Sequence, residues 1–341
     1  MLVPNILHVT HPFDFSGIQG KELFKMNAYR DTLPSTALSV RIAKAKAYRN
    51  RVIKHADTWK LSPRKRAQLE ALLGIGSCRE DISWSDMDAR IKSMKIMHNV
   101  VEDFFSRNGS PSLKIYHITF ADDLGLTSAN EPVLKLPALR RKIDKAIRFL
   151  GLSAIVTMEI QALTNKSPTG KGPGLMLHGH ALAWGSPSRR SLRENLETIN
   201  SSRSWKNHFE ATPVLSRKRN GDIVKDAMKV SSYLAKLPFD ATYQVPSGAD
   251  GKSRFRSTTS GYTNALAFRI AEGLSYHSIF ESVFSVADGK HIRTRWKQEL
   301  VAWHRRRVAR VGAIPPFPVA EFWVKARKNN GGHRYMPYTV H

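Results

Sequence analysis

Two histidines stand one residue apart in the apolar run GLMLHGHALAW, which covers residues 174–184. A short apolar run of this kind predicts a buried strand, in which residues i and i+2 lie on the same face. His178 and His180 would then present two imidazoles side by side, and neutral imidazole is the commonest metal ligand in proteins. Taken alone, the pair favours a strand with one hydrogen-bonded and one exposed histidine, because a single His-x-His is a short motif that also arises by chance.

A third donor is predicted from the preceding segment, IVTMEIQAL, which alternates between apolar and polar residues. Thr157, Glu159 and Gln161 form its polar face, and a hairpin across NKSPTGKGPG would turn that face toward the histidines. Pairing Glu159 with His180 would also place Gln161 opposite His178. We expect Glu159 to be the third ligand, with Gln161 as the alternate, although a slip of one residue would move Glu159 to the other face. The competing interpretation is an exposed polar pair between two strands.

A third element with reactive residue types is the segment KVSSYLAKLP. Tyr233 and Lys236 are spaced i and i+3, which places them on one side of a helix. That helix is expected to run from Asp222 to a stop at Pro238. The alternative is a tyrosine in the core beside a solvated lysine.

The ordered set of motifs resembles the HUH endonucleases, specifically the plasmid-type initiators of rolling-circle replication. The three family motifs correspond to YHITF (116–120), HGHALAW (178–184) and YLAK (233–236), and the resemblance covers residues 111–245. The later segment GKHIRTRWKQELVAWH looks like the tail region of bacterial plasmid Rep proteins. Gly179 departs from the family pattern, which has a bulky apolar residue between the histidines. Lys229 stands four residues before Tyr233, so the chain resembles single-tyrosine enzymes.

The resemblance implies a DNA endonuclease and strand transferase. Tyr233 would attack a phosphate of single-stranded origin DNA, giving a 5′-phosphotyrosyl enzyme and a free 3′-OH that primes a polymerase. His178, His180 and Glu159 would hold Mg²⁺ or Mn²⁺, although this mixed donor set does not exclude zinc. Lys236 would neutralise a phosphate oxygen or lower the tyrosine pKa. A host helicase and polymerase are the implied protein partners.

Four other functions fit parts of the pattern. A relaxase or a single-strand transposase would use the same chemistry, but relaxases generally carry the tyrosine ahead of the histidines and the transposases are compact. HVTH at His8 and HITF at His117 each match the His-x-Thr pattern of two-histidine phosphoesterases. A non-catalytic basic DNA-binding regulator would carry both motifs by chance.

The charge of the chain favours a nucleic-acid partner. Its 341 residues carry a formal net charge of +26, with basic clusters spread along the whole length. Such a field attracts phosphate backbones, although ribosome-like and membrane-surface proteins are also basic. Cys78 is the only cysteine, and neither a membrane-spanning run nor a secretory leader is evident. We therefore expect a cytoplasmic protein with no membrane partner, and the resemblance to plasmid Rep proteins implies a bacterial one.

The residues that could do chemistry must be positioned by a mainly antiparallel sheet, since strand and helix patterns alternate through residues 111–245 in an α+β domain. We predict a basic, helical segment over residues 1–110, which could bind DNA, and a mainly helical one over residues 246–341. Ser62 with Pro63, and Asp86 or Ser85, are the expected helix starts in the first segment. The stretch PSGADGKSRFRSTTSG, which begins at Pro246, is predicted as a linker or loop.

Overall fold

The computed structural model describes residues 35–110, 112–169, 172–206, 212–232, 234, 241–245, 254–257 and 262–328. Within these ranges the helices are α1 (Ser35–Asp57), α2 (Pro63–Leu72), α3 (Met87–Asn108), η1 (Asp123–Gly125), α4 (Leu136–Phe149), α5 (Arg189–Ser201), α6 (Ile223–Ser231), α7 (Asn264–Ser275), α8 (Gly289–Val311) and α9 (Val319–Lys328). The strands are β1 (Lys114–Phe120), β2 (Leu126–Ser128), β3 (Ser153–Leu163), β4 (Gly174–Gly185), β5 (Val214–Lys218), β6 (Ala241–Val245), β7 (Arg254–Ser257) and β8 (Val283–Val286).

One mixed sheet contains all of these strands. Its main path runs β5-β1-β4-β3-β6-β7, while β2 pairs with β4 and β8 pairs with β3. The pairing of β3 with β6 is parallel, and the other pairings are antiparallel. The predicted α+β class with a mainly antiparallel sheet and helical regions on either side in sequence is confirmed. Strands β2, β6 and β8 were not anticipated, because each is short and completed only by pairing with a longer strand.

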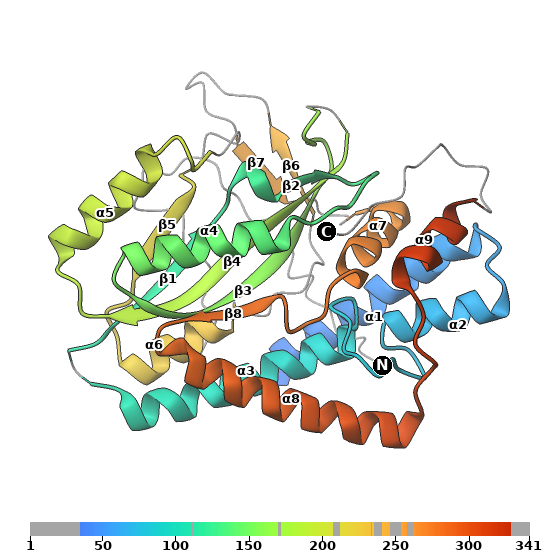
Figure 1. Cartoon of the computed structure of the whole chain (residues 1–341), viewed down its shortest axis with the longest axis horizontal. Coiled ribbons are helices and arrows are strands. Elements are labelled where there is room, and N and C mark those ends of the chain that lie inside the picture. The colour runs from blue at the N-terminus through green and yellow to red at the C-terminus, as the bar shows by residue number, and fades with distance from the viewer. Residues whose placement is uncertain are drawn as a thin grey trace, which may run out of the picture.

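The two faces of the central strands meet different helices, as Figure 1 shows with α4 and α5 on one side and α3, α6 and α8 on the other. Trp184 of β4 packs its ring against Phe104 and Phe105 of α3. His178 and His180 share the face of Trp184, because they are separated from it by even numbers of residues. We call this side the ligand face and the opposite side, which α4 covers, the α4 face.

Gly179 lies on the α4 face, and its lack of a side chain lets the helix approach the sheet. A Cβ added there would stand 2.7 Å from Cδ1 of Ile143, a fully buried residue of α4. Contacts to Met158 and Phe120 would remain at ordinary distances of 3.6 and 3.7 Å. The glycine between the two histidines therefore has a packing cause, which is the close approach of Ile143 to β4.

The expected helix starts are confirmed in the N-terminal segment. Ser62 caps α2 by accepting a hydrogen bond from the backbone of Lys65, and Pro63 is its first residue. Asp86, rather than Ser85, caps α3 by accepting from the amide of Ala89. The Ser85 hydroxyl instead donates to the carbonyl of Leu72, which ties the end of α2 to the start of α3.

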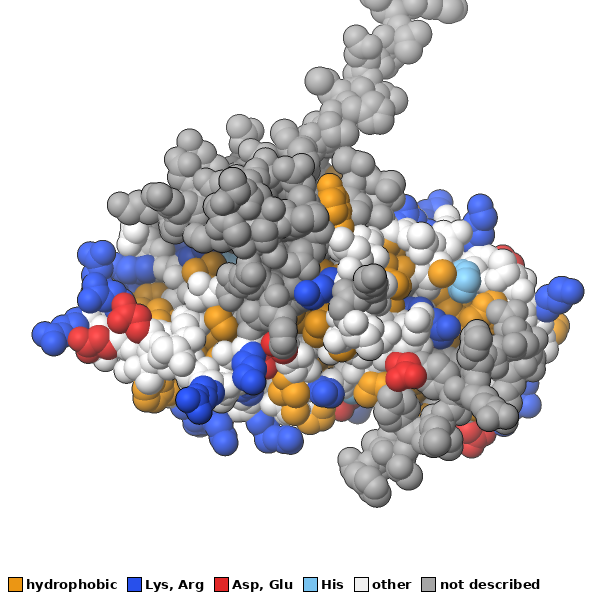
Figure 2. Space-filling view, turned by 90° about the horizontal axis from the view of Figure 1, so that it is seen from above, with side chains coloured by type: hydrophobic (Ala, Val, Ile, Leu, Met, Phe, Trp, Pro, Cys, Tyr) orange, Lys and Arg blue, Asp and Glu red, His pale blue; other side chains and the backbone are white. Residues whose placement is uncertain are grey.

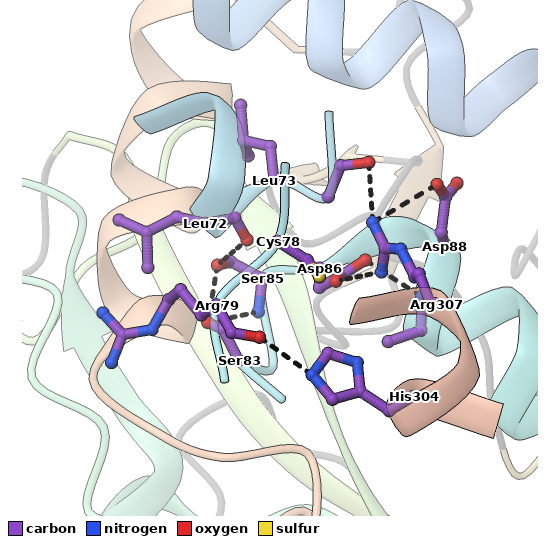
Figure 3. A network of polar contacts seen from close by, with 12 residues as sticks. Leu72, Leu73, Cys78, Arg79, Ser83, Ser85, Asp86, Asp88, His304 and Arg307 are labelled. Carbon is purple, nitrogen blue, oxygen red and sulfur yellow. Dashed lines mark hydrogen bonds and ion pairs between the residues drawn. The ribbon is translucent and has the colours of Figure 1, made fainter. Parts of the chain in front are cut away.

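A buried polar network joins α8 to this corner, although the residues are more than 200 positions apart in sequence (Figure 3). Arg307 contacts the capping carboxylate of Asp86 at 2.6 Å and donates to the carbonyl of Gly74 at 3.1 Å. One turn earlier in α8, Nε2 of His304 lies 2.8 Å from the carbonyl oxygen of Arg79. The ion pair and the additional hydrogen bonds compensate the buried charges of Arg307 and Asp86. They hold α8 against the connection between α2 and α3.

Two expectations about local structure are wrong. Helix α6 ends at Ser231, not at Pro238, and the hydroxyls of Ser231 and Ser232 each bond a carbonyl three residues back. Serine hydroxyls that compete for helix carbonyls weaken the last turn. The predicted loop after residue 246 contains β7, where Arg254–Ser257 pair with β6 at the edge of the sheet.

The hydrophobic core is shared by all three predicted segments. It includes Ala45 of α1, Ile155 of β3 and Trp296 of α8 within one cluster. Strand β8, from the segment 246–341, also adds to the sheet beside β3. The division of the chain at residues 110 and 245 stays a prediction about its organisation.

Candidate metal centre

The two predicted strands bring Glu159, His178 and His180 together on the ligand face. β3 and β4 pair antiparallel, with Glu159 directly opposite His178 and Thr157 opposite His180. The expected pairing of Glu159 with His180 is wrong by two residues. Because side chains repeat every second residue, a shift of two keeps all three donors on one face. The same shift places Gln161 opposite Met176.

The geometry of the three side chains fits a divalent cation. Oε2 of Glu159 lies 3.8 Å from Nε2 of His178 and 3.5 Å from Nε2 of His180. One donor atom from each residue lies within 4.8 Å of the other two. Donors that each bind an ion at about 2.1 Å stand roughly 3.0–3.4 Å apart in octahedral or tetrahedral geometry. The observed separations are slightly longer, so small side-chain movements would close the set around an ion.

Burial also distinguishes these residues from a surface polar pair. The Glu159 side chain is 3% exposed, and those of His178 and His180 are 12% and 13% exposed. A carboxylate is almost never buried without a cation or hydrogen-bond donors to compensate its charge. The exposed cross-strand pair considered from the sequence is therefore excluded, and a possible metal site is present.

Hydrogen bonds orient the two rings for ligation through Nε2. Nδ1 of His178 lies 3.3 Å from the carbonyl oxygen of Met176, so a proton on Nδ1 can be donated to the backbone. Nδ1 of His180 lies 3.2 Å from Nε2 of His117 and 3.3 Å from Oγ1 of Thr119. Metal-binding histidines typically bond through their second nitrogen in this way, which leaves the first nitrogen for the ion.

A small cavity of about 20 Å³ adjoins the site on the side of α3. It is lined by Arg90 of α3, by Thr157 and Glu159 of β3, and by Leu234. Burial lowers the pKa of Arg90 to about 10, and the charge of Glu159 opposes this shift. Oγ1 of Thr157 is buried and has no hydrogen-bond partner among the described residues. The volume is that of about one or two water molecules, and the polar lining suits a water.

The predicted nucleophile lies outside the described residues, as does Lys236. Their described neighbours are Ser232, which follows α6, and Leu234, which is 1% exposed and lines the cavity beside Glu159. His8 of the alternative phosphoesterase pattern also lies outside. His117 and Thr119 of the second His-x-Thr match lie in β1, beside His180.

Sequence reasoning did not assign a role at the site to His117, Thr119, Thr157 or Arg90. A signal for the first two exists in YHITF, where they alternate on one face of a strand as the two histidines of HGH do. The pairing of Thr119 with His180 across β1 and β4 makes them neighbours. Arg90 carries no comparable signal, because its helix reaches the site only through tertiary packing.

Comparisons with known proteins add no further assignment, because no family model, no curated protein and no solved structure matches the chain. Among the described residues, no helix is both long and apolar enough to cross a membrane. What is supported is an α+β chain that carries a mostly buried carboxylate and two imidazoles arranged as a possible metal site.

Proposed function

We propose that the protein is a metal-dependent DNA strand transferase of the kind that initiates rolling-circle replication. The observation that carries the proposal is the convergence of Glu159, His178 and His180 on one sheet face, in a chain with a net charge of +26. The basic side chains are spread over the face drawn in Figure 2 and not gathered in one patch. A distributed positive surface suits a long polyanion such as a single DNA strand.

Glu159, His178 and His180 would hold Mg²⁺ or Mn²⁺, which supplies charge stabilisation at a phosphate oxygen. Two imidazoles and one carboxylate leave coordination positions open for such an oxygen. Zinc shares this donor set, so the identity of the ion is a matter for experiment.

In the proposed reaction, Oη of Tyr233 attacks the phosphorus and forms a P–O bond, while the bond from phosphorus to O3′ breaks. The tyrosine proton leaves to solvent or a base, and the released O3′ takes up a proton to become a free hydroxyl. The phosphodiester energy is retained in the 5′-phosphotyrosyl link, so a 3′-OH can reverse the step and rejoin the strand. Lys236 would neutralise charge on the phosphate. Leu234, the residue that follows Tyr233, lines the cavity beside Glu159. This position supports the choice of Tyr233 as the nucleophile.

A denaturing gel tests the proposal. The protein is incubated with Mn²⁺ and a set of single-stranded oligonucleotides that contain hairpin-flanked sites, and a shifted band that survives denaturation reports a covalent adduct. We expect the adduct to disappear in Tyr233→Phe and Glu159→Gln and to persist in Tyr243→Phe, a control in β6. An adduct that survives Tyr233→Phe would exclude this nucleophile.

The alternative functions give different results in the same assay. A relaxase or a single-strand transposase would form the same adduct, but on a transfer-origin or transposon-end strand. A non-catalytic regulator would bind DNA without an adduct and without a metal requirement. The absence of an adduct on every strand, together with DNA binding in EDTA, would favour the regulator.

A further inference from the structure

His117 lies directly behind one of the two metal-site imidazoles. It projects from β1, and its Nε2 stands 3.2 Å from Nδ1 of His180, with ring centroids 5.3 Å apart. Only 4% of His117 is exposed. It does not belong to the group of donors that could share one ion, which consists of Glu159, His178 and His180. Its contact with the site therefore passes through His180.

The protons on the two rings follow from which nitrogen faces the ion. Nε2 of His180 points toward Oε2 of Glu159, so a bound ion requires the lone pair of Nε2 and leaves the proton on Nδ1. A buried N–H needs an acceptor, since an unsatisfied donor costs about 1–3 kcal/mol. Nε2 of His117 and Oγ1 of Thr119 are the atoms within reach, at 3.2 and 3.3 Å.

We propose that His117 is a positioning residue of the metal centre, whose Nε2 accepts the Nδ1 proton of His180 and fixes that ring with its own Nε2 toward the ion. His117 then carries its proton on Nδ1. Thr119 is a second, weaker acceptor for the same proton. The inference rests on the metal centre of the proposed function but not on DNA cleavage, so metal binding tests it separately.

An arginine lies on the side of His117 that faces away from β4. Arg217 is directly across from His117 in β5, which pairs with the other edge of β1. Among the three donors of the metal centre, Glu159 is the one with a formal charge. A site loaded with a divalent ion therefore keeps a net positive charge that favours a phosphate anion.

Mn²⁺ affinity, measured by titration calorimetry on the full-length protein, tests the role of His117. We expect His117→Leu to weaken Mn²⁺ binding by roughly 10- to 100-fold, the usual effect of losing such a partner. His117→Gln places a carbonyl oxygen near the position of Nε2 and should restore affinity to within about threefold of the wild type. The matched control is His304→Leu, since His304 is also 4% exposed but lies in the network between α8 and the α2–α3 connection. It should destabilise the protein without changing Mn²⁺ affinity.

A second measurement uses the unaltered chain, in case His117→Leu fails to fold. Long-range ¹H–¹⁵N spectra of the Mg²⁺-loaded protein report which ring nitrogen of each histidine is protonated, and we expect the Nδ1–H form for both His117 and His180. A His117 protonated on Nε2 would overturn the inference. So would a His117→Gln variant as weak as His117→Leu, or equal losses in His117→Leu and His304→Leu. A wild-type protein that binds no divalent ion would refute the metal centre and this inference together, whereas a missing DNA adduct alone would refute only the nicking activity.

Discussion

Replacing Gly179 with alanine tests whether the close approach of α4 explains the glycine between the two histidines. The added Cβ would stand 2.7 Å from Cδ1 of Ile143, closer than carbon atoms approach without displacement. Ile143 is fully buried in the core, so its side chain has little room to turn away. The other neighbours, Met158 and Phe120, would be in ordinary contact. The Cδ1 methyl group of Ile143 is therefore the atom with which the added Cβ clashes.

The expected change combines two opposing terms. An unfolded chain with alanine has less conformational freedom than one with glycine. The replacement of glycine by alanine in a strand therefore stabilises the folded protein by about 0.5–1 kcal/mol. Overpacking a tight core costs roughly 1–3 kcal/mol. Gly179→Ala should therefore destabilise the wild-type protein by about 0–2.5 kcal/mol, the difference between those terms. In an Ile143→Val background, where Cδ1 is gone, the same change should stabilise by about 0.5–1 kcal/mol.

Equilibrium urea unfolding of the four proteins in this double-mutant cycle measures the effect. A coupling free energy of about 1–3 kcal/mol between the two positions is expected, because the overpacking cost is present only while Ile143 keeps its Cδ1. Ile143→Val alone should cost about 0.5–1.5 kcal/mol. If Gly179→Ala stabilises the protein with Ile143 present, the methyl group yields freely and the packing explanation is refuted.

Three further predictions concern other parts of the molecule. Arg307→Met should lower the unfolding free energy by about 3–5 kcal/mol, seen as a reduced Tm, because Asp86 would stay buried without its cation. Burial lowers the pKa of His98 below 6.5 in the folded state, an effect that Glu102 partly opposes, so the unfolded chain takes up the proton first and stability is lost as the pH falls through 6.5. His98→Asn, which can still donate to Ser231, should reduce the slope of unfolding free energy between pH 6.5 and 5; an unchanged slope would contradict this. Glu159→Gln should weaken Mn²⁺ binding at least tenfold in calorimetry, since it removes the one charged ligand, and unchanged affinity would exclude Glu159 as a ligand.

The three donor residues of the site were predictable from the sequence, but the pairing of their strands was not. Alternation in IVTMEIQAL and GLMLHGHALAW places Glu159, His178 and His180 on one face under any even register, which is why an error of two residues in pairing left the donor set intact. The register itself depends on the connecting loop and on the helices that pack against the strands. The short strands β2 and β8 depend on tertiary pairing as well, and no local pattern marks them.

Some helix ends were also predictable from the sequence, and others were not. Ser62 and Asp86 were identified because a capping side chain acts within its own turn. The early end of α6 was missed because Ser231 and Ser232 are tolerated in many helices, and their bonds to carbonyls of the last turn are one of several options. Local signals are sufficient where a side chain has one strongly preferred partner in its own turn, as an N-cap residue has.

Successive residues of β4 point to opposite faces, so the metal-binding residues and the helix-packing residue are separate. His178 and His180 lie on the ligand face, whereas Gly179 between them packs against α4. A substitution at Gly179 should therefore change stability more than metal affinity, and one at His117 should do the reverse. Gly179→Ala would lower both stability and metal affinity only if the contact with Ile143 displaced β4 as a rigid unit. The Mn²⁺ affinity of Gly179→Ala decides between these cases. An affinity close to that of the wild type means that the structural change stays on the α4 face. A large loss means that the glycine is also needed to orient both imidazoles.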